Sequence, residues 1–358
     1  MNLLALTRYG NLAASSRLRM AQYFPYLTAQ GHTVKASPLL ENQSLLHFYA
    51  TGHHSFAQLA THYGKRIREC LRSQPVDLIW VEKELLPWVP AFAEQWLLQG
   101  RPYVVDYDDA TFHVYDQHSH PVLRRLFGRK IDTVMQHASL VIAGNDYLAQ
   151  RARSAGAPRV EILPTVVDLT RYPLTEKTNQ AAHPFTVGWI GSPSTTRYLH
   201  ALTPAFRTLA AESPFRLLLI GAAPFHPDGV PVTSLHWQES SEARDLQQAD
   251  VGIMPLNHSP WELGKCGCKL IQYMACGLPV IASPVGMNAT LVQPGTHGWL
   301  ASSPEEWLAH LRLLRDSPDL RRKMGAAGRQ QVEEQYQLAV TAPRLLGWME
   351  ALCNRKKQ

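Results

Sequence analysis

The chain has 358 residues, of which 45% are hydrophobic and 18% charged, a balance that fits about two globular domains and excludes a disordered or fibrous protein. Its net charge of +6 comes from 35 basic and 29 acidic residues, spread too evenly along the chain to indicate nucleic-acid binding. No apolar run approaches the roughly 18 to 20 residues of a membrane span, and five cysteines do not suggest a disulfide framework. We therefore expect a reduced, cytoplasmic protein of two domains.

Short apolar runs alternate with helix-length segments through the first half of the chain. Helical spacing over Arg17–Gln30 is stopped by Gly31. The predicted strands are Asn2–Thr7, Val76–Val81, Pro102–Asp106 and Leu140–Ala143. Strands that alternate with helices predict parallel β-α-β units, with helices on both faces of a sheet.

The same rhythm restarts after a polar stretch without periodicity. The predicted strands of the second half are Thr186–Ile190, Phe215–Ile220, Val251–Pro255 and Pro279–Ala282. We expect an α/β protein with a doubly wound domain at 1–172, a linker at 173–184 and a second doubly wound domain at 185–335. The tail at 336–358 has a helical pattern, and the sequence leaves open which domain it joins. Ligands of such sheets bind outside the carboxyl ends of the strands.

The most informative segment is WELGKCGCKLIQYMACGLPVIASP at 261–284. A loop that holds Gly264, Lys265 and Gly267 leads into a predicted helix over Lys269–Cys276. Backbone N–H groups at a helix N-terminus and the positive end of its dipole attract anions. Glycines allow close approach of a phosphate, and lysines four residues apart add charge. The pattern suits a diphosphate, and the alternative is a solvated lysine pair beside a well-capped helix.

The run KLIQYMACGLPVIAS resembles the donor-site helix of family 4 glycosyltransferases. Other segments similar to this family follow in the order expected for it: Val104–Phe112, Gly144–Ala152, Leu163–Pro173, Gly188–Pro193, Leu217–Gly221, Ala249–Leu256 and Gly277–Gly286. The resemblance implies the GT-B fold, in which two Rossmann-like domains face each other across a cleft. It also implies transfer of a sugar from a nucleotide-diphosphate-sugar co-substrate to a hydroxyl of a glycan or lipid-linked acceptor. The resemblance further implies that the anomeric configuration of the sugar is retained and that no cofactor is required. By the resemblance, closure of the two domains would exclude water.

The chain departs from the Glu-x7-Glu pair of that family. The matching positions are Gly264 and Gln272. By the resemblance, Gln272 contacts the ribose hydroxyls, here through a neutral amide, and the backbone of Gly264 or the nearby Glu262 serves the sugar. The diphosphate would lie at Gly191–Ser192 and at the start of the helix. There Lys265 and Lys269 would stabilise charge on the departing nucleotide.

The first half of the chain would form the acceptor side. The turn that follows the first strand is rich in small residues; Gly10 would let its backbone approach the donor, and Arg17 ends the turn. By the resemblance this turn lines the cleft. A plain β-α turn with solvated arginines is the alternative.

An acidic run follows another predicted strand, with Asp106, Asp108 and Asp109 ahead of His113. Carboxylates and a histidine at a strand end suit either a divalent metal or the hydroxyls of an acceptor. Since lysines and a helix dipole can neutralise the leaving diphosphate, we expect no metal. We favour acceptor contacts, with at least one aspartate capping a turn, and count His113 among the catalytic candidates.

The sequence leaves two rival functions possible, and it does not decide whether one basic segment contacts a membrane. The rivals are a GT-B epimerase, which would need acid and base carboxylates in the cleft, and a non-catalytic homologue, which the missing glutamates favour. The segment LRRLFGRK at 123–130 places four basic residues around Leu126 and Phe127. It suits peripheral contact with an anionic membrane that carries a lipid-linked acceptor, at the inner face of the membrane, and equally a solvated helix face.

Overall fold

The computed structural model describes residues 1–53, 55–72, 76–98, 100–174 and 183–355, and most of the expected linker lies outside these ranges. The chain divides into two units. Unit 1 comprises Met1–Thr165, Leu263–Cys266 and Leu338–Gln358, and unit 2 comprises Val166–Glu262 and Gly267–Gln337. The C-terminal helix, which the sequence left unassigned, thus belongs to unit 1.

Unit 1 is built on a six-stranded parallel sheet of order β2-β1-β3-β4-β5-β6. Its strands are β1 (Asn2–Tyr9), β2 (Thr33–Leu40), β3 (Leu78–Glu82), β4 (Tyr103–Tyr107), β5 (Leu140–Ala143) and β6 (Val160–Ile162). The four inner strands are almost fully buried, as expected for a parallel sheet covered on both faces. The four strands predicted in this half all form, with ends shifted by at most two residues.

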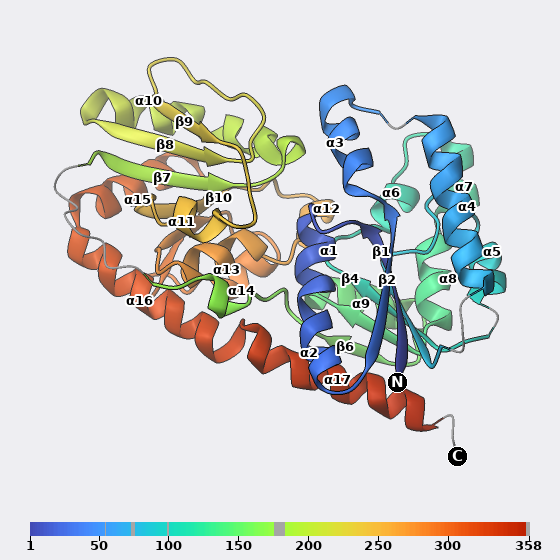
Figure 1. Cartoon of the computed structure of the whole chain (residues 1–358). Helices are drawn as coiled ribbons and strands as arrows, with labels where there is room; N and C mark the ends of the chain where they lie inside the picture. Colours follow the sequence, from blue (N-terminus) through green and yellow to red (C-terminus); the bar gives the residue numbers. More distant parts are fainter. Residues whose placement is uncertain (54, 73–75, 99, 175–182, 356–358) are drawn as a thin grey trace. The chain divides into compact units, whose positions relative to one another are not determined.

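Helices flank this sheet (Figure 1). They are α1 (Ala14–Arg19), η1 (Ala21–Tyr23), α2 (Phe24–Ala29), α3 (Asn42–Thr51), α4 (Phe56–Arg72), α5 (Ala91–Leu98), α6 (His113–Asp116), α7 (Pro121–Phe127), α8 (Lys130–His137), α9 (Asp146–Ser154) and α17 (Leu338–Arg355). The predicted helix over Arg17–Gln30 is divided into three pieces, because Pro25 lies in the first turn of α2 and proline lacks the N–H that a continuous helix needs there. Tyr23 Oη lies 3.0 Å from Thr341 Oγ1 and links the η1 turn to α17.

Unit 2 has a second six-stranded parallel sheet, of order β12-β11-β10-β7-β8-β9. Its strands are β7 (Phe185–Ile190), β8 (Phe215–Ile220), β9 (Val232–Leu235), β10 (Val251–Met254), β11 (Val280–Ala282) and β12 (Gly298–Leu300). Read from β9, this is the 3-2-1-4-5-6 order of dinucleotide-binding sheets. The four strands predicted for this half are all present.

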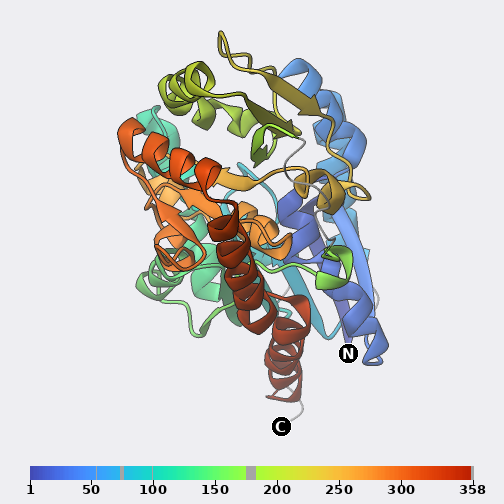
Figure 2. The same ribbon diagram turned by 90° about the vertical axis from the view of Figure 1, so that its left-hand side faces the viewer.

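The helical elements of unit 2 cover its sheet (Figures 1 and 2). They are η2 (Leu169–Arg171), η4 (Pro193–Leu202), α10 (Thr203–Glu212), α11 (Glu242–Leu246), α12 (Pro260–Leu263), α13 (Cys268–Ala275), α14 (Met287–Leu291), α15 (Pro304–Asp316) and α16 (Pro318–Gln335). The core holds the buried rings of Trp189, Phe206, Phe215 and Trp307. A Cβ at Gly325 of α16 would lie 2.0 Å from the carbonyl oxygen of Gly277, so glycine allows α16 to approach the end of α13. Each unit is thus a parallel sheet with flanking helices, the doubly wound α/β architecture expected from the sequence.

Candidate functional site

Each sheet has a point at which its strand order reverses, and ligands of open α/β sheets bind beyond the strand ends at that point. In unit 1 the reversal lies between β1 and β3, and in unit 2 between β7 and β10. The turns after these strands therefore define two half-sites, one in each unit.

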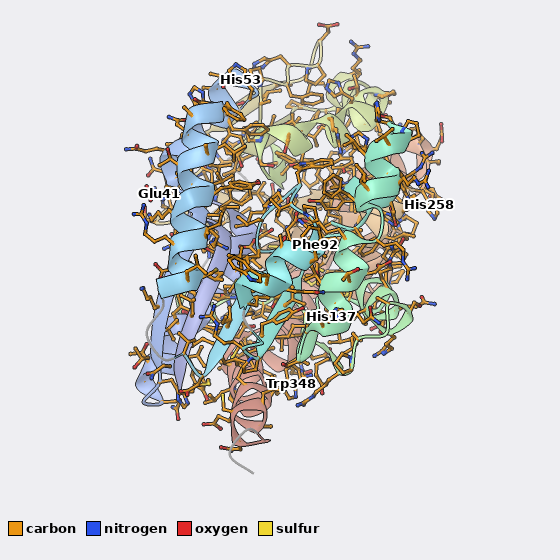
Figure 3. The ribbon with its side chains drawn as sticks, turned by 90° about the vertical axis from the view of Figure 1, so that its right-hand side faces the viewer. Glu41, His53, Phe92, His137, His258 and Trp348 are labelled. Carbon is orange, nitrogen blue, oxygen red and sulfur yellow. The ribbon has the colours of Figure 1, made fainter. Side chains whose placement is uncertain are left out.

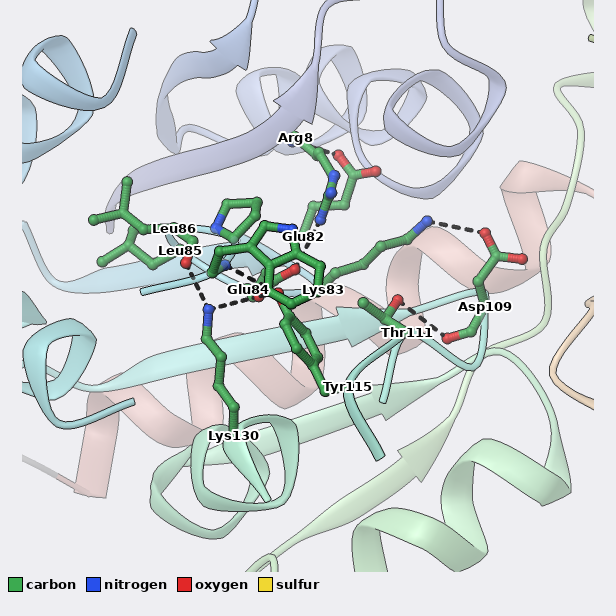
Figure 4. A network of polar contacts seen from close by, with 12 residues as sticks. Arg8, Glu82, Lys83, Glu84, Leu85, Leu86, Asp109, Thr111, Tyr115 and Lys130 are labelled. Atoms are coloured by element: carbon green, nitrogen blue, oxygen red, sulfur yellow. Dashed lines mark hydrogen bonds and ion pairs between the residues drawn. The ribbon is translucent and has the colours of Figure 1, made fainter. Parts of the chain in front are cut away.

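Lys83 occupies the turn directly after β3, at the reversal point of unit 1 (Figure 4). Its φ is +65°, a left-handed conformation that is unfavourable for any residue except glycine. Glu84 N donates to Glu82 O at 2.7 Å and closes the turn around it. The Lys83 ammonium lies 2.9 Å from Asp108 Oδ1 and 3.0 Å from Asp109 Oδ2. The strained turn therefore holds this ammonium group against the acidic run that follows β4.

A second lysine reaches the Asp109 carboxylate from a distant part of the chain. Lys265 Nζ lies 2.7 Å from Asp109 Oδ1. The segment that carries it is held by Asn145, whose side-chain amide donates to the carbonyls of Leu263 and Lys265 at 3.1 Å each. The Cys266 thiol lies 3.3 Å from the carbonyl oxygen of Asp108. Half of the predicted phosphate loop is thus bound to the acidic run within unit 1.

The opposite charges in this cluster shift one another's pKa values toward the ionised forms. Burial by itself would raise the pKa of Asp109, but the ammonium groups of Lys265 and Lys83 outweigh it and hold that pKa well below its usual range. Burial would lower the pKa of Lys83, yet the carboxylates of Asp108 and Asp109 raise it above the ordinary value. The pKa of Lys265 is raised in the same way, mainly by Asp109 against burial. At neutral pH the Asp109 carboxylate and the ammonium groups of Lys83 and Lys265 are therefore charged.

Three residues predicted to lie on the acceptor side, Asp106, Arg17 and Gly10, make contacts within unit 1. Asp106 Oδ1 accepts from Arg19 Nε at 2.8 Å, and both side chains are buried. Burial raises the pKa of Asp106 in spite of Arg19. Arg17, also buried, donates to the carbonyl of Asn11 at 2.9 Å, so it is not the solvated arginine of the alternative, and its place in a cleft stays a prediction. A Cβ at Gly10 would lie 2.3 Å from Asn42 Oδ1, so a larger residue there would displace the Asn42 side chain, which accepts from Leu12 N at 3.2 Å.

His113 of α6 uses both of its ring nitrogens, one within α6 and one toward α9. Nδ1 lies 2.8 Å from Asp116 Oδ1, and Nε2 lies 2.8 Å from the hydroxyl oxygen of Tyr147 on α9. The side chain is 8% exposed. Its catalytic role stays a prediction, and a ligand would have to displace Tyr147 to reach Nε2.

In unit 2 the start of α13 lies beside the reversal point. The residue before the helix, Gly267, has φ +66° and no side chain with which to cap the first turn. A Cβ there would lie 2.2 Å from Leu291 Cδ1. Lys269, in the first turn, places its ammonium 5.6 Å from the centroid of the Trp189 ring on β7. The helix start and one lysine therefore meet near the end of β7.

In the turn after β7, the backbone at Gly191 lies close to the end of β8 and to the Trp189 ring. Gly191 N donates to the carbonyl of Ile220 at 3.0 Å, and a Cβ on Gly191 would lie 2.5 Å from the Trp189 ring. Ser192 precedes the 3-10 helix η4, and its carbonyl accepts from Thr195 N at 2.9 Å. Glycine is required at 191 because the Trp189 ring fills the space of a side chain.

Glu262 and Gly264, the two alternatives for the missing first glutamate, belong to different units. Glu262 is buried, and its carboxylate accepts from Tyr198 Oη at 2.6 Å and from Ser259 Oγ. At Gly264 a Cβ would lie 2.5 Å from the backbone nitrogen of Ala110. Whether either serves the donor sugar stays a prediction.

Gln272 lies on the buried face of α13, and its side-chain nitrogen donates to Glu242 Oε1 at 2.8 Å. Glu242 also accepts from Trp237 Nε1 at 2.6 Å and from the Tyr172 hydroxyl. Burial raises the pKa of Tyr172 well above its ordinary value, as does the carboxylate. A cavity of about 450 Å³ adjoins this group; it is lined by Arg171, Tyr172, Glu239, Ser240, Glu242 and Ala243.

Two residues of these half-sites were not predicted from the sequence. Lys83 stands in the charged triplet Glu82–Glu84, which ends an apolar strand, so the position of strand ends could have found it. Glu242 lies in a polar stretch, and only its contacts distinguish it. Among the residues that the structure describes, no group of three or more His, Cys, Asp or Glu side chains is arranged to hold a metal ion.

Comparisons with known proteins agree with this geometry. Residues 184–316 match the family described as glycosyl transferases group 1. A GDP-mannose-dependent monoacylated alpha-(1-6)-phosphatidylinositol monomannoside mannosyltransferase from Corynebacterium glutamicum is 25% identical over 249 residues, which are 62% of this chain. The match spans 64% of that enzyme's length.

Solved structures show the fold over nearly the whole chain. Sucrose-phosphate synthase from Thermosynechococcus elongatus has a TM-score of 0.75 at 17% identity, with 98% of this chain and 99% of that chain covered. HepE from Anabaena, in complex with UDP and glucose, has a TM-score of 0.70 at 18% identity, with 98% and 100% covered. These structures show that the chain has the GT-B fold. The family match shows that residues 184–316 are similar to glycosyl transferases group 1.

Proposed function

We propose that this protein transfers a sugar from a nucleotide diphosphate donor to an acceptor hydroxyl, with retention at the anomeric carbon. The observation that carries the proposal is the start of α13, where an uncapped helix end and the Lys269 ammonium adjoin the β7 turn. This half-site lies within the segment that matches the glycosyltransferase family. A helix N-terminus with a lysine is suited to a diphosphate.

On the donor side, the diphosphate occupies the turn Gly191–Ser192 and the first N–H groups of α13, and the ribose contacts Gln272. Lys269 stabilises the negative charge that develops on the leaving nucleoside diphosphate as the sugar bond breaks. Lys265 is omitted from this role because its ammonium is bound to Asp109 in unit 1. We expect Lys269 and the positive end of the α13 dipole to neutralise the diphosphate without a metal ion.

On the acceptor side, the carboxylates of Asp108 and Asp109 accept hydrogen bonds from acceptor hydroxyls. Lys83 and Lys265 hold Asp109 ionised, so it acts as an acceptor of hydrogen bonds rather than as an acid. The relative from Corynebacterium acts on a phosphatidylinositol mannoside, and a lipid-linked or glycan acceptor fits the same chemistry.

The role of Lys269 is tested by binding of UDP, GDP and ADP and of the matching nucleosides, measured by calorimetry. Lys269→Ala should weaken binding of the diphosphate about tenfold or more, because a charge-assisted contact to phosphate is lost, and should change nucleoside binding less than twofold. Lys323→Ala, which removes an exposed lysine of α16, is the control. Equal losses for diphosphate and nucleoside in Lys269→Ala would refute the assignment.

Turnover separates this proposal from its two rivals. The protein is incubated with UDP- and GDP-sugars, with and without an acceptor extract. Transfer requires both components, epimerisation requires the donor alone, and a non-catalytic homologue binds without turnover. NMR of the product's anomeric proton then reports whether configuration is retained.

We also propose that unit 1 contacts an anionic membrane surface through α7. Arg124, Arg125 and Arg129 are exposed, together with Val122 and Leu126 at 55% and 68%. On α5, on the same side of unit 1 (Figures 1 and 3), the side chains of Phe92 and Trp96 are 72% and 67% exposed. Exposed apolar groups beside arginines are typical of surfaces that bind lipid headgroups.

Two details refine this surface. Lys130, one of the four basic residues of the segment, is buried and paired with Glu84 and Glu94 at 2.7 and 2.9 Å, so it is not part of the surface. No helix in the described part of the chain combines the length and the apolar character needed to cross a membrane. The proposed contact is peripheral.

A further inference from the structure

Glu242 is a buried carboxylate that three side chains approach from different parts of unit 2. It is 3% exposed. Gln272 of α13 and the Tyr172 hydroxyl both donate to Oε1, the former at 2.8 Å, and Trp237 Nε1 donates to Oε2 at 2.6 Å. A buried charge with this many partners is held in one place. It can therefore fix the orientation of whatever bonds to it.

The contact with Glu242 decides which way the Gln272 amide points. A carboxylate only accepts hydrogen bonds, so the NH₂ end of the amide must face Glu242 and the oxygen must face away. On its other side, Gln272 Oε1 lies 3.7 Å from the thiol of Cys268, the first residue of α13. The amide oxygen is thus directed toward the helix start, where the proposed diphosphate site lies.

We propose that Glu242 is a positioning residue that holds Gln272 so that its carbonyl oxygen accepts a hydrogen bond from a ribose hydroxyl of the nucleotide. The inference rests on the proposed function, since it takes the ligand at α13 to be a nucleotide. A ribose hydroxyl donates well to a fixed oxygen, whereas an amide free to rotate would present its NH₂ end part of the time. Glu242 removes that freedom before the ligand binds.

The pair explains why an amide and a carboxylate stand at these two positions. A glutamate at 272 would bring two carboxylates within 2.8 Å of each other in a buried place, where like charges repel strongly. The double exchange, Glu242→Gln with Gln272→Glu, again places one amide donor beside one carboxylate acceptor. The amide introduced at position 242 would then donate to the carboxylate introduced at position 272, whose other oxygen would still accept from the ribose.

Unit 2 also contains a second hydrogen-bonded glutamine–glutamate pair, to which we assign no role in nucleotide binding. On α16, Gln330 Nε2 donates to Glu334 Oε1 at 2.8 Å, and both side chains lie on the exposed part of the helix. It has the same chemistry and distance as the Glu242–Gln272 pair but is remote in sequence from the start of α13. Its exchange controls for a general effect of moving a charge.

The experiment compares Glu242→Gln, Gln272→Glu and the double exchange by calorimetry. The probes are UDP and GDP, each with its 2′,3′-dideoxy counterpart. Each single variant should bind the ribonucleotide about tenfold more weakly and should bind the dideoxy compound like the wild type. In Glu242→Gln the amide at position 242 no longer fixes which end of the Gln272 amide faces the ribose. In Gln272→Glu the repulsion of Glu242 displaces the carboxylate that would accept from the ribose. The double exchange should return ribonucleotide binding to within about threefold of the wild type. Exchange of Gln330 and Glu334 should change neither.

The outcomes separate the inference from the function on which it rests. If the wild type binds neither nucleotide, the proposed function fails. If the wild type binds but the single variants lose affinity for ribonucleotide and dideoxynucleotide alike, or if the double exchange binds no better than the singles, Glu242 does not position Gln272 for the ribose. Should the single variants fail to fold, the double exchange decides: it must keep the wild-type preference for ribonucleotide over dideoxynucleotide, and losing that preference overturns the inference.

Discussion

The Cβ atom that any other residue would add at position 264 would lie 2.5 Å from the backbone nitrogen of Ala110 and 2.7 Å from its Cβ. Real side chains do not approach backbone atoms so closely. On either side of Gly264, the carbonyls of Leu263 and Lys265 accept from Asn145, so the segment cannot move away without losing them. Glycine at this position is thus required by packing in unit 1, where the resembled family has a glutamate.

Gly264→Ala should therefore lower the free energy of unfolding by about 1 to 3 kcal/mol, the usual range for overpacking a filled site. Gly264→Glu, which restores the glutamate of the resembled pattern, should be more damaging still and should not increase transfer. Urea unfolding at neutral pH measures both. Gly229→Ala is a poor control because its φ is +74°, but Gly347→Ala meets open space and should change little. A Gly264→Ala variant as stable as the wild type would contradict the packing argument.

At this scale the sequence predicted residues that lie in a recognisable element and missed those defined by distant contacts. The pattern of a helix start singled out Lys269, and the family resemblance singled out Gln272; their roles stay predictions. Lys265 was found too, but its partner Asp109 is 156 positions away, and spacing within one segment does not show such a contact. Glu242 was missed for the same reason, since Gln272 lies 30 residues further along the chain.

Among the elements, the strands that the sequence missed are β2, β6, β9 and β12, which are the edges of the two sheets. A central strand of a parallel sheet is buried on both faces and reads as a continuous apolar run. The edge strands are partly exposed, and β6 and β9 contain no fully buried residue. Polar residues interrupt β2, β6 and β9, and β12 has only three residues, so none of the four contains an apolar run long enough to predict a strand.

Between β3, α5 and α8, one ammonium serves two carboxylates (Figure 4 shows Glu84 and Lys130). Lys130 lies 2.7 Å from Glu84 Oε2 and 2.9 Å from Glu94 Oε1. The backbone N–H groups of Leu85 and Leu86 also donate to Glu94, at 3.2 and 3.0 Å. Burial raises the pKa of Glu94 to about 7, in spite of Lys130.

This raised pKa predicts a loss of stability as the pH rises. Glu94 binds its proton more tightly in the folded protein than in the unfolded chain, so its contribution is complete below about pH 4.5 and disappears as the pH passes 7. The free energy of unfolding of unit 1 should fall by about 1 kcal/mol between pH 6 and pH 8 from this group. Glu94→Gln should abolish that part of the slope. Urea titrations at several pH values measure it, and an unchanged slope in the variant would show that another group titrates.

At the scale of the whole molecule, the sequence predicted two doubly wound sheets, which the structure contains. It did not predict that the chain enters unit 1 three times, through Met1–Thr165, Leu263–Cys266 and Leu338–Gln358. Thr341, Ala342, Leu345 and Met349 of α17 are completely buried. An apolar stripe on a helix predicts that it packs, but not against which sheet.

The last prediction concerns the exposed arginines of α7 and of the turn between α7 and α8. Each basic residue near an anionic membrane contributes about 1 kcal/mol to binding. Replacing Arg124, Arg125 and Arg129 by alanine should therefore weaken partition onto vesicles of phosphatidylcholine with phosphatidylglycerol by about 3 kcal/mol, roughly a hundredfold. Sedimentation with vesicles at low ionic strength measures this, and added salt should weaken wild-type binding in the same direction.

The matched control removes three exposed arginines of unit 2, Arg207, Arg244 and Arg322, with side chains 52%, 80% and 64% exposed. It lowers the net charge by the same amount, so a general effect of charge would weaken both triple variants equally. If α7 is the membrane-binding surface, only its own triple variant loses binding, and Leu126→Ala weakens the remaining, salt-resistant part because a side chain 68% exposed in solution no longer enters the interface. Equal binding of the wild type to neutral and anionic vesicles would exclude the electrostatic contact altogether.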